Sequence, residues 1–141
     1  MVLLDNYKSK IDEFILESVQ IFTNQYGNPK SIGIYCCPWS GWMTINFNLK
    51  KSLQEANNNC PNFEFVEFAI LDFPEWEDEY ETNDPKYQRG NTVFEFNHKD
   101  GDEKLNEIFL PYLLSIVAEI KTKIKQVIVV QFLDRNYFNV L

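Results

Sequence analysis

The fold is decided most clearly by residues 105–133, which read LNEIFLPYLLSIVAEIKTKIKQVIVVQFL. In the first two thirds of this stretch, apolar residues recur at spacings of three and four, the period of an amphipathic helix. The last third, Gln126–Leu133, is an almost continuous apolar run, which is typical of a buried strand. The sequence therefore predicts a helix over about 103–124 followed by a strand. Because Pro111 lies inside that helix, we expect either a kink there or a helix start close to it.

Upstream residues repeat this succession of helical and strand patterns. Leu4–Tyr26 carries a second helical stripe and is followed by Gly27 and Pro29, residue types that end helices. Ser31–Cys37 and Met43–Leu49 then predict an antiparallel hairpin. The second of these strands alternates between apolar and polar residues, so we expect one buried face and one wet face.

The middle of the chain predicts shorter elements. Lys50–Ala56 favours a short helix, and Phe63–Phe73 a third strand with a bulge near Phe65, where its apolar phase slips. Thr82–Gly90 is polar and indicates a loop, whereas Thr92–Phe96 favours another short strand.

Together these elements predict an α+β fold, with a mainly antiparallel sheet packed against two amphipathic helices at 4–26 and about 103–124. A length of 141 residues predicts a single domain, 1–141, and a hydrophobic fraction of 45% supplies a core without metal or disulfide support. Three cysteines are an odd number, unlike a disulfide framework. The start of the chain turns polar at Asp5, and no apolar run has the length of a membrane span. We therefore expect a cytoplasmic protein.

The negative charge of the chain is concentrated in Ser52–Pro85. This segment holds ten of the 21 acidic residues and no Lys or Arg, whereas the remainder has eleven acids against 13 bases. A net charge of −8 disfavours direct binding of nucleic acid or of an anionic membrane. It suits a basic protein partner, although the solubility that net charge confers is a sufficient alternative explanation.

The densest acidic part interleaves carboxylates with two aromatic rings. It forms a candidate partner-binding surface made of Glu75, Trp76, Glu77, Asp78, Glu79, Tyr80, Glu81 and Asp84. Trp76 and Tyr80 lie four residues apart, so they share one side of a helical turn and would serve as anchors amid charge. In the alternative interpretation both rings face the core and the carboxylates form a solvated surface. Trp39 and Trp42 bracket the hairpin turn and are either secondary interaction candidates or a cap on the edge of the core.

Catalytic and metal-binding patterns are weak. Residues 75–81 match neither a calcium loop nor the separated carboxylates of a glycosidase, and Cys36, Cys37 and Cys60 lack zinc-site spacing. A Cys–His pair would require His98, the only histidine, to fold back on a cysteine. Phosphate loops, serine nucleophile elbows and HExxH are all missing from the sequence. We therefore predict no catalytic residue, no metal, no cofactor and no enzymatic activity.

Several ordered features resemble those of small bacterial immunity proteins, the cytoplasmic inhibitors of polymorphic and contact-dependent-inhibition toxins. The features are the strand Ile32-Gly33-Ile34-Tyr35, the Leu49–Leu53 segment, a Trp-x-x-x-Tyr-Glu element at Trp76, Tyr80 and Glu81, and a late helix before Val127–Asp134. That pattern often has a second Trp shortly before the first, where this chain has Asp72 or Phe73. The resemblance implies an α+β fold and tight binding to a cognate toxin domain, often a nuclease.

These observations lead to one expected function and two alternatives. We expect an immunity protein that neutralises a basic, nuclease-type toxin domain through the acidic and aromatic surface. The first alternative is a small hydrolase-like enzyme with an acidic cleft, which a deep pocket with perturbed carboxylates would favour. The second is an adaptor that self-associates through an edge strand. The sequence carries no signal of oligomeric state.

Overall fold

The computed structural model describes residues 1–97, 101–135 and 138–141. The helices and strands in these ranges are β1 (Val2–Leu3), η1 (Leu4–Tyr7), α1 (Lys8–Tyr26), β2 (Ser31–Cys37), β3 (Trp42–Asn48), η2 (Cys60–Asn62), β4 (Phe65–Asp72), α2 (Pro74–Tyr80), β5 (Lys86–Arg89), β6 (Thr92–Glu95), α3 (Gly101–Ile120), β7 (Val127–Phe132) and β8 (Phe138–Val140). The elements η1 and η2 are single 3-10 turns.

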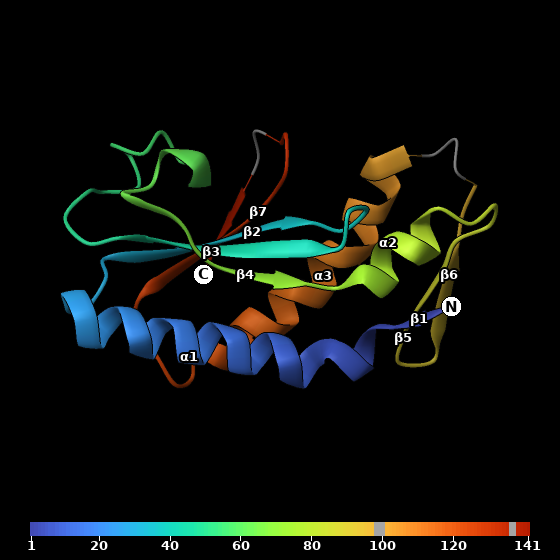
Figure 1. Ribbon diagram of the computed structural model, residues 1–141, viewed down its shortest axis with the longest axis horizontal. Helices are drawn as coiled ribbons and strands as arrows, with labels where there is room; N and C mark the ends of the chain where they lie inside the picture. The colour runs from blue at the N-terminus through green and yellow to red at the C-terminus, as the bar shows by residue number, and fades with distance from the viewer. Residues whose placement is uncertain (98–100, 136–137) are drawn as a thin grey trace.

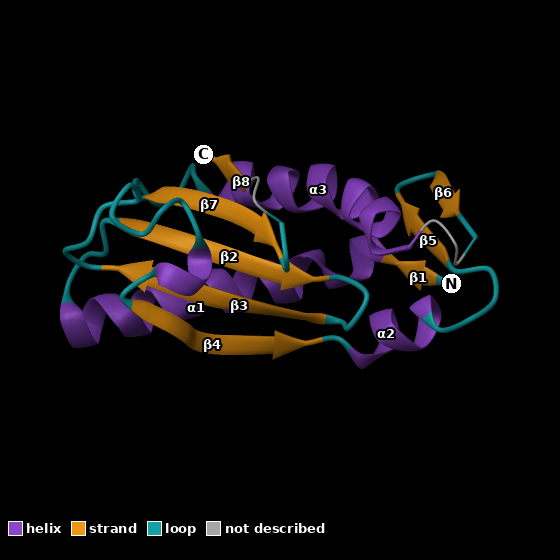
Figure 2. Ribbon diagram, turned by 90° about the horizontal axis from the view of Figure 1, so that it is seen from above, coloured by secondary structure: helices purple, strands orange, loops and turns teal. Residues whose placement is uncertain are grey.

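The strands form two sheets. The larger has the order β4-β3-β2-β7-β8, and all its neighbouring strands are antiparallel except β2 and β7. The smaller has the order β1-β5-β6, in which β1 and β5 run parallel. Helices α1 and α3 lie along one face of the larger sheet (Figure 1), and the smaller sheet lies beyond its end, next to α2 (Figure 2). The predicted α+β fold is confirmed.

The core lies between the larger sheet and the two long helices. Ile34 pairs in register with Ile45 on one side and Val130 on the other, and all three side chains are buried. From α1, Phe22 stacks on Phe47 with ring centroids 4.2 Å apart. Burial of such a side chain stabilises the fold by about 1.5–3 kcal/mol, so the apolar stripes of the helices fix how they sit on the sheet.

The two predicted helices are present with shifted ends. The first begins as the turn η1 before α1, and it ends at Tyr26 with the Gly27 N–H bonded to the Thr23 carbonyl. The second, α3, runs continuously through Pro111, whose ring is exposed. The alternative in which the helix starts close to this proline is therefore wrong. None of the helices in the described ranges combines the length and hydrophobicity that a membrane span requires.

Two local predictions were wrong. The Thr82–Gly90 segment is not only loop, because it contains β5, which pairs with the two-residue β1 and with β6. The Lys50–Ala56 segment has no helix, although Ser52 and Glu55 exchange the reciprocal hydrogen bonds of a capping box. The next residues, Asn57 and Asn58, adopt left-handed φ values of 54° and 50°, which end the incipient helix.

The polar face of β3 is buried and not wet. Thr44, Asn46 and Asn48 are at most 2% exposed, because the segment that follows β3 folds back over part of this face (Figure 2). Asn46 Nδ2 donates to the Gly33 carbonyl at 3.1 Å, and Asn48 Nδ2 donates to Ser31 Oγ at 3.0 Å. These bonds satisfy the amides, so their burial is tolerated.

The third strand carries the predicted bulge. The register between β3 and β4 shifts between Ile45 and Phe47, and Glu67 has a φ of 55°. The Glu67 N–H donates to Asn46 Oδ1 at 2.7 Å, which replaces the ladder bond that the bulge interrupts. Beyond the bulge, Ala69–Asp72 pairs regularly with β3 and leads directly into α2.

Candidate functional site

The position of α2 is fixed by a close approach between its start and the β2–β3 turn. The Phe73 N–H donates to the Gly41 carbonyl at 2.6 Å, and Pro74 occupies the first turn of the helix, where proline is favourable. Gly41 has a φ of 68°, and a Cβ added there would collide with the Phe73 carbonyl oxygen. Only glycine therefore fits this contact between the turn and the helix.

Trp76 lies on the inner side of α2 and is fully buried. Its ring stacks on Phe73 at 4.1 Å and contacts Tyr7 and Phe109 at 5.6 and 4.7 Å between centroids. The Tyr87 hydroxyl donates to the Trp76 carbonyl at 3.0 Å. The expectation that Trp76 is an exposed anchor is therefore wrong, because a helix this short needs its apolar side packed against the core to form.

Tyr80 is half-buried one turn after Trp76. Its hydroxyl donates to Asp102 Oδ1 at 2.7 Å, and burial together with this carboxylate raises the pKa of Tyr80. The ring lies 6.4 Å from that of Phe96. Tyr80 thus connects α2 to the first turn of α3, a structural role that limits it as an anchor for a partner.

The outer side of α2 is acidic and exposed. Five of the predicted site residues lie there or in the turn that follows, and we call them the acidic surface: Glu75, Glu77, Asp78, Glu81 and Asp84. Those in the helix fall on the arc opposite Trp76. Within the described ranges, the acidic surface takes part in no salt bridge. The helix therefore brings Glu75, Glu77 and Asp78 together on one side, and all five carboxylates are open to solvent.

Glu79 does not belong to the acidic surface. One of its carboxylate oxygens lies 2.6 Å from the Met1 amino group, and the other accepts the Lys86 N–H at 3.1 Å. Burial alone would raise the pKa of Glu79, but these partners hold it below its ordinary value. These contacts attach the small sheet to α2, and the predicted binding role of Glu79 stays a prediction.

The two hairpin tryptophans have different surroundings. Trp39 packs at the edge of the core, as in the capping alternative. Trp42 is half-buried on the sheet face that the helices do not cover, opposite Asp72 in register and with its ring 6.2 Å from that of Tyr35. A depression of about 200 Å³, the Trp42 pocket, is lined by Trp42, Thr44, Glu67, Ile70 and Asp72.

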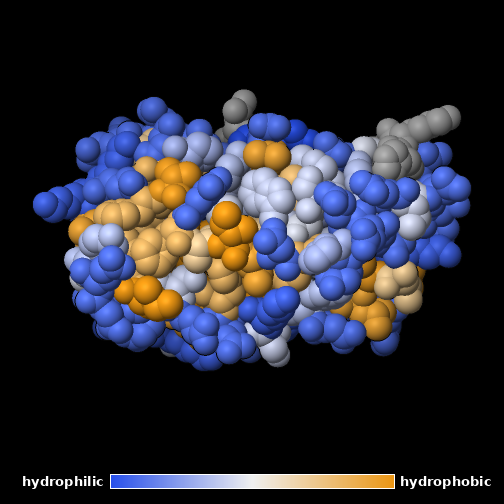
Figure 3. Space-filling view, in the orientation of Figure 1, coloured by the Kyte–Doolittle hydropathy of each residue, from blue (hydrophilic) through white to orange (hydrophobic). Residues whose placement is uncertain are grey.

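The acidic surface and the Trp42 pocket adjoin, because Asp72 lines the pocket and ends the strand that leads into α2. Ile70 is 54% exposed and Val66 is 44% exposed. Hydrophobic side chains gather on the side of the molecule that carries α1 and β4 (Figure 3). Sequence reasoning missed this apolar part, although the phase slip in Phe63–Phe73 was a signal that some of its apolar residues must point away from the core.

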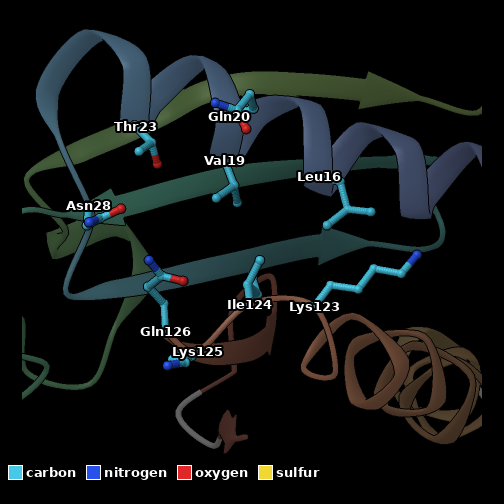
Figure 4. A pocket seen from close by; sticks show the side chains of 9 residues that line it. All are labelled: Leu16, Val19, Gln20, Thr23, Asn28, Lys123, Ile124, Lys125 and Gln126. Atoms are coloured by element: carbon cyan, nitrogen blue, oxygen red, sulfur yellow. The ribbon is translucent and has the colours of Figure 1, made fainter.

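A groove larger than the Trp42 pocket lies elsewhere, between α1 and the segment after α3 (Figure 4). Its volume is about 590 Å³, and its lining residues are Leu16, Val19, Gln20, Thr23, Asn28, Lys123, Ile124, Lys125 and Gln126. Val19 and Ile124 point toward each other across it, with lysines at its rim. Because no Asp or Glu lines this groove, it is not the acidic cleft that the hydrolase alternative requires.

The cysteines are buried, free thiols. Burial raises the pKa of Cys36 and Cys37, and it raises that of Cys60 to about 12. Thiols held protonated in this way are poor nucleophiles and poor metal ligands. His98, the other member of the considered Cys–His pair, lies outside the described residues. In the part of the chain that the structure describes, no group of His, Cys, Asp and Glu side chains could hold a metal ion.

No protein-family model, curated protein or solved structure matches this chain. The acidic surface and the Trp42 pocket are therefore the features of the described chain from which a function is proposed.

Proposed function

We propose that this protein is an immunity protein, a non-enzymatic inhibitor that binds a basic toxin domain and blocks its substrate site. The observation that carries the proposal is the acidic surface, whose five carboxylates are exposed and have no salt-bridge partner among the described residues. Like charges this close repel one another in the free protein. A basic partner relieves that repulsion, whereas the fold does not require these charges.

The acidic surface suits the cationic site of a nuclease. Such a site gathers Lys and Arg side chains that contact nucleic-acid phosphates. Carboxylates presented on a rigid helix would occupy the same side chains and exclude the substrate. Opposite fields also steer the two proteins together, which raises the association rate at low ionic strength.

The Trp42 pocket supplies the apolar part of this interface. A partially exposed indole beside exposed Ile70 resembles the apolar centre of a protein interface, and the acidic surface resembles its charged rim. In this proposal Trp42, and not the buried Trp76, controls the dissociation rate. Charges at the rim control mainly the association rate.

The test is to express any toxin domain that the genes flanking this chain encode and to measure its binding kinetics with the chain. The variant Glu77→Lys/Asp78→Lys changes the acidic surface, and Glu13→Lys/Glu17→Lys makes the same change of charge at exposed positions on α1. We expect the α2 variant to associate at least about 10-fold more slowly at low salt and with a flatter salt dependence. Equal slowing by both variants, or unchanged association of the α2 variant, would contradict the proposal.

A further inference from the structure

The strand β4 forms an open edge of the larger sheet. It ends the strand order, and its outer side has no strand partner within the described ranges. It is eight residues long and contains neither Lys nor Pro, whereas β8 at the opposite edge has three residues. Lysine, proline, short length and β-bulges are among the usual means by which proteins prevent pairing at an edge. Of these, the edge at β4 has only the bulge at Glu67.

The accessible part of this edge is the segment beyond the bulge. Glu67, with its left-handed backbone, interrupts the strand, and Ala69–Asp72 then continues in regular register with β3. The outward-facing N–H and C=O groups of this segment are available to another strand. This segment also leads directly into α2, so a strand placed beside it would lie next to the acidic surface.

The Trp42 pocket gives that added strand a side-chain pattern. Ile70 and Asp72 lie on the same face of β4 as Trp42 and Thr44, which they oppose in register. Side chains of an added strand that stand opposite Ile70 and Asp72 would have Cβ atoms about 4.5–5.5 Å from theirs. An apolar side chain suits the place beside Ile70 and Trp42, and a cationic side chain suits the place beside Asp72.

The negative charge around β4 favours a basic strand over a second copy of this chain as the partner of this edge. If two copies of the chain paired through β4, the acids of each strand, Glu67 and Asp72, would approach those of the other copy, and each chain carries a net charge of −8. An extended basic segment meets the same acids with opposite charge. Its main chain would supply the hydrogen bonds, as in other examples of strand addition.

We infer that the partner of this protein contributes an extended segment of alternating apolar and basic residues, which pairs with β4 at Ala69–Asp72 and places an apolar side chain in the Trp42 pocket. This inference rests on the proposed function, because it names the part of the basic partner that is recognised. It adds main-chain pairing, which the electrostatic proposal does not require.

The experiment uses a short synthetic peptide that alternates lysine and valine, with both ends blocked. The matched control peptide has the same sequence with a methyl group on every backbone nitrogen, so it keeps its charge but has no backbone N–H to donate along either of its edges. Amide hydrogen exchange of the full chain is followed residue by residue with each peptide. We expect the first peptide to slow exchange of β4 amides within Ala69–Asp72 at least 10-fold, and the methylated peptide to leave them unchanged.

A pair of variants tests the location. Ile70→Lys places a cation in the pocket, and Val93→Lys adds the same charge on β6, at a position that is 50% exposed and lies in the other sheet. We expect Ile70→Lys to weaken peptide binding at least 10-fold and Val93→Lys to change it less than twofold. Equal effects of the two variants would overturn the inference.

The outcomes separate this inference from the proposed function. In one outcome, Glu77→Lys/Asp78→Lys removes peptide binding, whereas Ile70→Lys and backbone methylation leave it intact. That outcome overturns strand addition and preserves the acidic surface as the binding site. In another outcome, the β4 amides become more protected from exchange as the protein concentration rises, with no peptide present. The edge then pairs with a second copy of the chain, and the inference is overturned. Unprotected β4 amides at about 1 mM peptide also overturn it.

Discussion

The inner and outer sides of α2 differ in composition and in what they contribute. The inner side buries Trp76 against Phe73 and Phe109, whereas the outer side carries the acidic surface. Both sides come from seven consecutive residues, so the role of each residue follows from its position around the helix axis. In this helix stability comes from the aromatic side, and the proposed binding comes from the acidic side. The following predictions test that division, from the largest effect on stability to the smallest.

Removing the buried indole should have the largest effect. Trp76→Ala leaves a cavity between α2 and α3, and we expect it to lower the free energy of unfolding by about 3–5 kcal/mol. Urea denaturation followed by circular dichroism measures this change. Trp42→Ala, at a half-buried ring on the uncovered sheet face, is the matched control, with an expected loss of about 1 kcal/mol. If the two substitutions cost the same, the inner side of α2 does not hold the helix.

The contact between Gly41 and Phe73 should be the next most sensitive. Gly41→Ala combines a left-handed backbone, which costs about 1–2 kcal/mol, with a collision at the Phe73 carbonyl. We expect a total loss of about 3 kcal/mol or more. Gly90→Ala is the control, because Gly90 also has a positive φ, of 58°, but a Cβ there meets nothing within 4 Å. Thermal or urea unfolding of both variants gives the comparison, and equal losses would show that the close approach is unimportant.

Glu79 is the one acid of α2 that should affect stability through its charge. Its pKa is lowered in the folded protein, so its carboxylate stabilises the fold above its ordinary pKa of 4.5, and this contribution is lost as pH falls through the folded pKa. We expect Glu79→Gln to lose about 1 kcal/mol at pH 7 and to match the unchanged protein in strong acid. Unfolding measured across this pH range tests it. Glu77→Gln, at an exposed position with no salt-bridge partner among the described residues, is the matched control, and an equal loss of stability there at pH 7 would contradict the prediction.

Reversing the outer charges should affect stability least. Glu77→Lys/Asp78→Lys changes exposed side chains with no salt-bridge partner among the described residues, so the free energy of unfolding should stay within about 0.5 kcal/mol of its original value. The same urea measurement applies. A loss above about 2 kcal/mol would mean that the outer side contributes to the fold, and the division between the two sides would not hold.

The parts of the fold that were predictable from the sequence depend on local periodicity. The stripe of α3 and the alternation of β3 are visible within one element, so both elements were predicted correctly. The prediction that the polar face of β3 is wet was wrong, because Asn46 and Asn48 are covered by residues that follow the strand. The sheet that joins β1 to β5 was missed for a similar reason, since a two-residue strand has no periodicity and its partner lies far along the chain.

The candidate site was predicted in part for related reasons. Exposed acids are ordinary on a helix surface, so Glu77 and Asp78 were placed correctly. Trp76 was ambiguous, because an aromatic ring among carboxylates fits an anchor or a core position equally well. The ion pair of Glu79 with the Met1 amino group was not predicted, because sequence spacing does not reveal it. Ile70 was missed because its exposure depends on the bulge at Glu67.

The left-handed residue within β4 has a consequence for aggregation. Fibrils grow when a flat strand acts as a template for identical strands in endless succession. The kink at Glu67 leaves only the short regular run Ala69–Asp72 beyond it at this edge. In the proposed mode of binding, this run would accept one foreign strand, while the kink would hinder the repeated stacking of copies on which a fibril depends.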